Sequence, residues 1–76
     1  MPQFFIHVEN GFGFMEDQEG LQCPSLGHAK IAAINAAADL IADELKGGKA
    51  QVRATFYIED EQHRPVLNLP VVATIG

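Results

Sequence analysis

The chain of 76 residues suits one small domain spanning residues 1–76, since domains typically contain about 50 to 250 residues. With 47% hydrophobic and 20% charged residues it is too apolar for intrinsic disorder, yet its apolar runs are shorter than the roughly 20 residues that cross a bilayer. Ten acidic against five basic side chains give a net charge of -5, which disfavours nucleic acid as a partner.

The N-terminal residues predict a β-hairpin. Aromatic and β-branched side chains are frequent here, which is typical of a strand over about residues 3–9. Period-two alternation places Phe4, Ile6 and Val8 on one face and Phe5, His7 and Glu9 on the other. Asn10-Gly11 is favoured in tight hairpin turns, so a return strand is expected over residues 12–16. The acidic turn Asp17–Gly20 follows, because Asp and Gly are typical of turns.

One long helix is predicted over residues 26–46. Ser25 is a favoured N-cap, alanine is frequent through the segment, and Gly47-Gly48 follows the last turn. At 100° per residue, one apolar stripe contains Ile31, Ile34, Ala38, Ile41 and Leu45, widened by Leu26, Ala33, Ala37 and Leu40. The opposite side carries His28, Asn35, Asp39, Asp43 and Lys46. We expect the apolar stripe to face a sheet.

Two further strands are predicted after the helix, over residues 52–59 and 65–69. In the first, Val52, Ala54, Phe56 and Ile58 alternate with Arg53, Thr55, Tyr57 and Glu59. The turn Asp60–His63 lies between the two strands. Pro70 is expected to end regular pairing, because it has no N–H to donate. The apolar tail Val71–Ile75 is left without a partner that the sequence identifies.

The order β-β-α-β-β predicts an α+β fold, a two-layer sandwich in which the helix covers one face of an antiparallel four-stranded sheet. The face that carries Phe4 and Phe56 should meet the helix. The opposite face of the sheet should then be left uncovered.

The motifs of the chain, taken in order, resemble those of a family of small bacterial proteins. They are Met1-Pro2, Phe4-Phe5-x-His7-Val8, Gly11-x-Gly13, Asp17-x-x-Gly20-Leu21, Pro24-x-Leu26, an alanine-rich helix ending at Gly47, Ile58-x-Asp60, and Pro65-Val66-Leu67-x-Leu69-Pro70. This order resembles the domain of unknown function DUF6894 over nearly the whole chain. The resemblance implies a fold and a cytoplasmic bacterial setting, and it implies no activity. His63 stands where the family usually has a turn glycine, which weighs against a positive-φ turn there.

The uncovered sheet face and the C-terminal tail form the candidate interaction surface. Its residues are Phe5, His7, Arg53, Tyr57, Val66, Asn68, Val71, Val72 and Ile75. Exposed apolar patches often mark association surfaces. We therefore expect a small non-catalytic module that binds a protein partner or itself, by sheet-face packing or by edge-strand pairing. A solvated outer face with scattered hydrophobic residues is the alternative.

A ligand-binding protein or enzyme built on His7, Cys23 and His28 is a second possibility, and it requires these side chains to converge beside a cavity. Cys23 precedes a helix N-terminus, which can activate a thiol, but its position just before Pro24 favours a structural role. No spacing of histidine and cysteine indicates a metal site.

The remaining candidate functional residues are better explained by structural roles than by catalysis or ligand binding. Asp39 and Asp43 lie one turn apart on the polar side of the helix, as on a solvated surface, and Gly11–Gly13 is too short for a phosphate loop. Nucleic-acid binding by aromatic residues on the sheet would need surrounding positive charge, and the face holds only Arg53. We expect no catalytic residue, cofactor or metal.

The expected setting is the cytoplasm. The chain has one cysteine, so it forms no internal disulfide, which fits a reducing compartment. Residues 1–4 carry no basic stretch and no cleavage site of a secretory signal.

Overall fold

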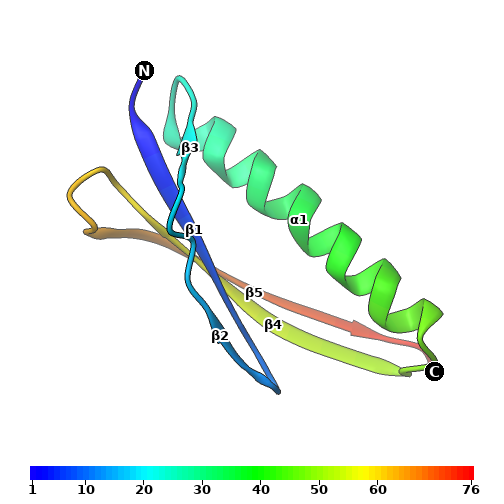
Figure 1. Ribbon diagram of the computed structural model, residues 1–76. Coiled ribbons are helices and arrows are strands. Elements are labelled where there is room, and N and C mark those ends of the chain that lie inside the picture. The colour runs from blue at the N-terminus through cyan, green and yellow to red at the C-terminus, as the bar shows by residue number, and fades with distance from the viewer.

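One helix and one antiparallel sheet form two layers in the computed structural model, which describes residues 1–76 (Figure 1). The elements in chain order are β1 (Gln3–Asn10), β2 (Gly13–Met15), β3 (Leu21–Gln22), α1 (Leu26–Lys46), β4 (Gln51–Glu59) and β5 (Pro65–Thr74). The strand order is β2-β1-β4-β5, and β3 also pairs with β1. The predicted α+β class is confirmed, with five strands instead of four.

The centre of the sheet consists of β1 and β4, the two strands whose alternation is clearest in the sequence. They pair antiparallel with Ile6 opposite Ile58 and Val8 opposite Phe56. Ile58 is completely buried, and Phe56 lies with it in the core beneath α1. Alternation of apolar side chains along both strands therefore produces one apolar face, as predicted.

The turn between β1 and β2 is shifted by one residue from the predicted Asn10-Gly11. Asn10 is still paired, with Gly13, and the two-residue loop is Gly11-Phe12. The Asn10 side-chain oxygen accepts a hydrogen bond from the backbone N–H of Phe12 at 2.8 Å. This Asx-type turn draws Phe12 out of the strand, so β2 begins one residue later than predicted.

The helix α1 meets the sheet with the residues predicted to widen the apolar stripe, and the predicted centre of the stripe lies to one side. The buried residues of α1 are Ala29, Ala33 and Ala37, whereas Ile31 and Ile34 are exposed. Small side chains allow the backbone of a helix to approach a sheet closely, so the alanines occupy the contact. The stripe from Ile31 to Leu45 lies along one flank of the helix instead.

The edge strand β5 continues through Pro70 to Thr74, so the prediction that Pro70 ends the strand is wrong. Thr55 is opposite Pro70 in a register that is continuous from Leu67 to Thr74. Because β5 is the last strand of the sheet, proline is tolerated where its nitrogen faces away from the neighbouring strand. The tail after Pro70 is thus part of the sheet, with Val71 opposite Ala54.

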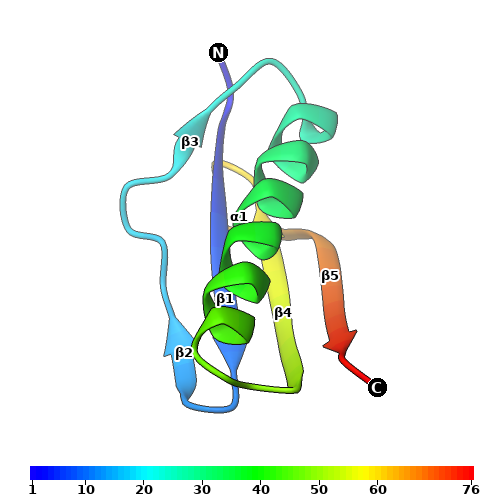
Figure 2. The same cartoon turned by 90° about the vertical axis from the view of Figure 1, so that its right-hand side faces the viewer.

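The helix does not cover the sheet evenly. Figure 2 shows α1 in front of β1 and β4, with β5 beyond one side of the helix. On that side the residues of β5 that point toward the helix layer are only half-buried, among them Leu69 and Val71. The fold therefore leaves apolar surface along β5 and the adjacent flank of α1.

Candidate functional site

The outer face of the sheet, opposite α1, is covered at one end by the chain itself. Phe5 and His7 are expected on an uncovered surface, but their exposed fractions are 8% and 5%. The ring of His63 stacks on Phe5 with a centroid distance of 4.3 Å, and Phe14 lies 5.7 Å from the ring of His7. The expectation that Phe5 and His7 are uncovered is therefore wrong.

Both ring nitrogens of His7 have partners within the chain. Nδ1 accepts a hydrogen bond from the backbone N–H of Asp17 at 2.9 Å, and Nε2 lies 2.7 Å from Oε1 of Glu59. Since Nδ1 accepts, the proton of the neutral ring is on Nε2, which donates to Glu59. The imidazole is buried and fully bonded, so it holds the loop before β3 against β1 and has no nitrogen free for a ligand.

The side chain of Asp17 bonds to the edge of β1 between β2 and β3. Its carboxylate accepts hydrogen bonds from the backbone N–H groups of Ile6 at 3.0 Å, Gly20 at 3.0 Å and Glu19 at 3.2 Å. Partial burial acts to raise the pKa of Asp17, but these three hydrogen bonds together hold it below its ordinary value. Asp17 therefore stabilises the loop chiefly in its ionised form.

Glu59 joins the two histidines of this face. The hydrogen bond from His7 lowers the pKa of Glu59, and Nδ1 of His63 lies 3.3 Å from the same oxygen. Glu59 and His63 flank the turn between β4 and β5, whose first residue Asp60 accepts from the N–H groups of Gln62 and Arg64 at 2.9 Å each. This network fixes the turn that carries the His63 ring over Phe5.

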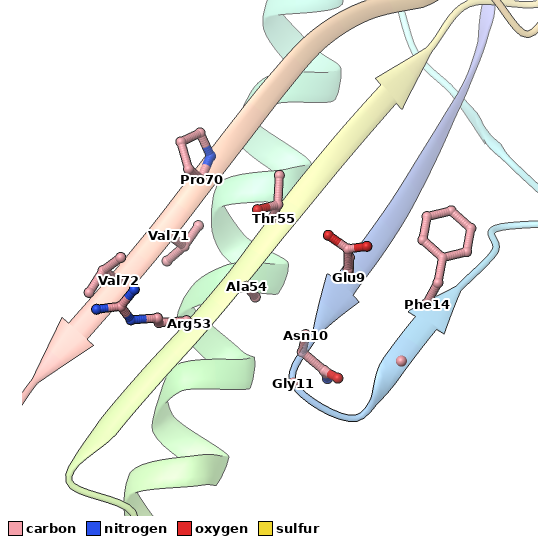
Figure 3. A pocket seen from close by; sticks show the side chains of 11 residues that line it. Glu9, Asn10, Gly11, Phe14, Arg53, Ala54, Thr55, Pro70, Val71 and Val72 are labelled. Carbon is pink, nitrogen blue, oxygen red and sulfur yellow. The ribbon is translucent and has the colours of Figure 1, made fainter.

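The other end of the outer face forms an open trough of about 610 Å³ between the β1–β2 hairpin and strands β4 and β5 (Figure 3). Arg53 lies on the β5 side near Val72, and Glu9 and Phe14 lie on the hairpin side. Tyr57 donates a hydrogen bond to Glu9 at 3.1 Å, which raises the pKa of the phenol. Of the predicted surface, Arg53, Val66, Asn68, Val72 and Ile75 are exposed, and Tyr57 and Val71 are half-buried.

Few charged or reactive side chains line the trough. Its lining includes one cation, Arg53, which forms no salt bridge, and one carboxylate, Glu9. It contains no histidine, cysteine or serine, and its one hydroxyl group belongs to Thr55, which lies opposite Glu9 in the sheet.

A second surface lies on the flank of α1 that faces β5. Ile31 and Ile34 are 60% and 50% exposed, and between α1 and β5 runs a groove of about 290 Å³. The residues that line this groove are all apolar: Ala33, Ile34, Ala37, Ala38, Ile41, Phe56, Leu69, Pro70 and Val71. Residues 65–76 contain no charged side chain.

We call this surface the α1–β5 strip and define it by Ile31, Ile34, Ala38, Ile41 and Leu45 of α1 with Leu67, Leu69 and Val71 of β5. Charged side chains and proline ordinarily protect edge strands, and β5 has Pro65 and Pro70 but no charged side chain. Ile34, Ala38, Ile41, Leu69 and Val71 line the groove, so the strip is an apolar surface that the chain covers only in part.

A comparison with known protein families identifies the family of the chain. A family model described as a domain of unknown function (DUF6894) matches residues 3–73. The chain belongs to the DUF6894 family. No curated protein and no solved structure matches the chain.

Motif residues of this DUF6894 chain have identifiable structural roles. Asp17 and Gly20 of the Asp-x-x-Gly motif form the loop that closes over β1, with Gly20 at a φ of 75°. His63 is expected to weigh against a positive-φ turn, yet it adopts a φ of 60°, so the backbone is left-handed there. Stacking of its ring on Phe5 accompanies this unfavourable backbone conformation.

The three residues of the enzymatic alternative are not brought together in the DUF6894 chain. His7 lies on the outer face, whereas Cys23 belongs to the core on the helix side and its thiol lies 3.5 Å from the carbonyl oxygen of Ser25. His28 is exposed in the first turn of α1, with Nδ1 3.0 Å from the Ser25 hydroxyl. No group of three or more His, Cys, Asp or Glu side chains is placed to hold a metal ion, and α1 is not long and apolar enough to cross a membrane.

Sequence reasoning missed two features of the site. The first is the α1–β5 strip: the spacing predicts that the stripe from Ile31 to Leu45 faces the sheet, and the alanine stripe beside it is the signal that it does not. The second is the role of Asp17, because a turn-forming aspartate and one that bonds a neighbouring strand look alike in sequence.

Proposed function

We propose that this DUF6894 chain is a non-catalytic protein-interaction module that acts by self-association through the α1–β5 strip. The observation that carries the proposal is the uncharged apolar groove between the flank of α1 and the edge strand β5, with Ile31 and Ile34 exposed on that helix. Exposed apolar patches of this kind mark association surfaces. We place this role in the cytoplasm, which the single unpaired cysteine supports.

The strip favours a second copy of the chain as its occupant. A partner that recognises charge would need opposite charges on the surface it binds, and the strip carries none. A second copy presents the same apolar strip, and a two-fold interface buries the same patch on both subunits. The outer face is a weaker candidate, because its own loops cover Phe5 and His7.

The size of the strip indicates moderate affinity. A stable interface of standard size buries about 800 Å² per partner, roughly one sixth of the 4990 Å² surface of this chain. The stripe from Ile31 to Leu45 spans about 21 Å along α1 at 1.5 Å per residue. We expect the weak association typical of small interfaces, with a dissociation constant of about 1–100 µM.

The proposal is tested by the mass of the protein in solution, measured by sedimentation equilibrium from about 1 µM to about 1 mM. The parent chain should convert from monomer to dimer over this range. Ile34→Glu should raise the dissociation constant at least about tenfold, because the carboxylate would be buried without a partner. Ala36→Glu is the matched control, since Ala36 is exposed outside the strip on the same helix.

Two results would overturn the proposal. One is a parent chain that remains monomeric at about 1 mM, well above the expected dissociation constant. The other is a dimer that Ala36→Glu weakens as much as Ile34→Glu does while both variants keep the helix content of the parent.

A further inference from the structure

We infer that two copies associate through antiparallel packing of their α1 helices about a two-fold axis at Ala38. This inference rests on the proposed self-association and specifies its geometry. Its basis is the spacing along one flank of α1, the position of the smallest residue, the helix dipoles and the proline in β5.

The exposed flank has the spacing of a helix-packing seam. Its residues are Ile31, Ile34, Ala38, Ile41 and Leu45, which follow one another at intervals of three, four, three and four. This is the a/d pattern of two heptads, in which each apolar side chain inserts between residues of a facing helix. In the chain alone that pattern has no facing helix, because the sheet contacts the alanine stripe of Ala29, Ala33 and Ala37.

Ala38 is the central member of the stripe and has its smallest side chain. Two bulky residues precede it, Ile31 and Ile34, and two follow it, Ile41 and Leu45. An antiparallel arrangement about Ala38 lets the two backbones approach at the axis and sets Ile31 of one copy near Leu45 of the other. The groove of about 290 Å³ beside the stripe equals roughly ten water volumes of about 30 Å³, enough to receive apolar side chains of the second copy.

The helix dipoles favour the antiparallel direction. Antiparallel packing places the positive N-terminal end of each α1 helix beside the negative C-terminal end of the other, whereas parallel packing places like ends together. Glu44 contributes nothing to this choice, because its carboxylate is already 2.8 Å from Nζ of Lys49 within the same chain.

The free edge of β5 is a poor site for pairing with a strand of a second copy. Pro70 lies within the continuous pairing with β4, so the position without an N–H faces the free edge. A strand added at that edge would lose a hydrogen bond at its middle and would meet the proline ring. Helix packing therefore accounts for the strip better than edge-strand pairing does.

Disulfide cross-linking in the full chain tests this geometry. Ala38→Cys should give about tenfold more covalent dimer on mild oxidation than the control Ala36→Cys, because an axial pair has a high effective concentration. An equal mixture of Ile31→Cys and Leu45→Cys chains should form the mixed covalent dimer in preference to Ile31 variants linked to each other. Cys23 is kept in every variant because it is buried, and the parent chain measures any cross-linking through it.

Different results of these experiments would contradict the geometry of the helix pair and the self-association itself. If the mass is that of a dimer but Ala38→Cys does not cross-link more than Ala36→Cys, the two-fold axis does not lie at Ala38. Preferential linking of Ile31→Cys chains to each other overturns the antiparallel direction and indicates parallel helices. A monomeric mass at about 1 mM overturns the self-association and this inference with it.

Discussion

The carboxylate of Asp17 replaces a strand where the edge of β1 has no neighbour. β2 pairs with β1 from Val8 onward and β3 pairs at Gln3 and Phe4, so the N–H of Ile6 would otherwise be unpaired on that side. A backbone donor without a partner in a partly buried position is costly. Asp17 supplies the acceptor, and its own N–H bonds to His7.

Substitution of Asp17 by asparagine is expected to lower the free energy of unfolding by about 1–2 kcal/mol at neutral pH. The amide has one acceptor oxygen, so it cannot serve both the N–H of Ile6 and those of Glu19 and Gly20. Urea unfolding followed by circular dichroism measures the change. Asp39→Asn on the exposed side of α1 is the control and should shift the free energy by less than about 0.5 kcal/mol.

The pH dependence of the stability of Asp17→Asn tests whether the ionised carboxylate causes the stabilisation. The pKa of Asp17 is lower in the folded state than in the unfolded state, so the stabilisation is complete above about pH 4 and is lost as the pH falls through the lowered pKa. The parent chain should therefore lose more stability between about pH 4 and pH 2 than Asp17→Asn does. Equal acid sensitivity of the two chains would show that the ionised carboxylate is not responsible.

At the scale of the elements, the loop after β2 depends on Gly20. An alanine Cβ there would lie 2.6 Å from Nε2 of Gln3 and 3.0 Å from Cε1 of Phe5, and the φ of 75° is unfavourable for any other residue type. Gly20→Ala is expected to destabilise the chain by about 1–3 kcal/mol, because strain and close contact add.

Gly27→Ala is the matched comparison for Gly20→Ala and should raise the free energy of unfolding, whereas Gly20→Ala should lower it. Its Cβ would meet only the Ser25 hydroxyl oxygen at 3.6 Å, an ordinary contact, and alanine is the better helix former. A gain of about 0.5 kcal/mol is expected in the same urea measurement. Equal losses for both variants would contradict the role assigned to the loop.

The elements themselves follow from local sequence, whereas their contacts depend on tertiary structure. Ser25 and Gly47-Gly48 delimit the observed helix, and alternation indicates β1 and β4. The continuation of β5 could not be predicted, because the effect of Pro70 depends on which way its nitrogen faces, and that depends on strand order. The orientation of α1 is ambiguous in sequence, since an alanine stripe and an isoleucine stripe lie side by side and close packing selects the smaller one.

The candidate site was only partly predictable for the same reason. The exposure of Arg53 and Val72 follows from alternation, because both lie on the side of the sheet away from α1. The burial of Phe5 and His7 depends on Asp17 and His63, which belong to turns distant in sequence from β1. Alternation assigns a residue to a face of the sheet, and it contains no information about which loop covers that face.

At the scale of the whole molecule, net charge opposes the proposed association while the contact itself is apolar. Each copy carries -5, so two copies repel each other at low ionic strength. Raising the salt from about 0.01 M to about 0.15 M shortens the screening length from about 30 Å to about 8 Å. The dissociation constant from sedimentation equilibrium should therefore fall a few-fold over this range.

The opposite salt dependence would contradict an apolar contact. If attraction between opposite charges held the copies together, salt would weaken the dimer. The α1–β5 strip carries no charged side chain, so we expect the repulsion between the two net charges to dominate the salt dependence.

The position of the only thiol in the chain makes it an internal reporter of motion. Cys23 is 7% exposed and lies in the core just before the first turn of α1. A maleimide or disulfide reagent can reach this sulfur only while the start of the helix is lifted from the strands beneath it. The rate at which the native chain is alkylated thus measures how often the two layers separate there, without any label or substitution being introduced.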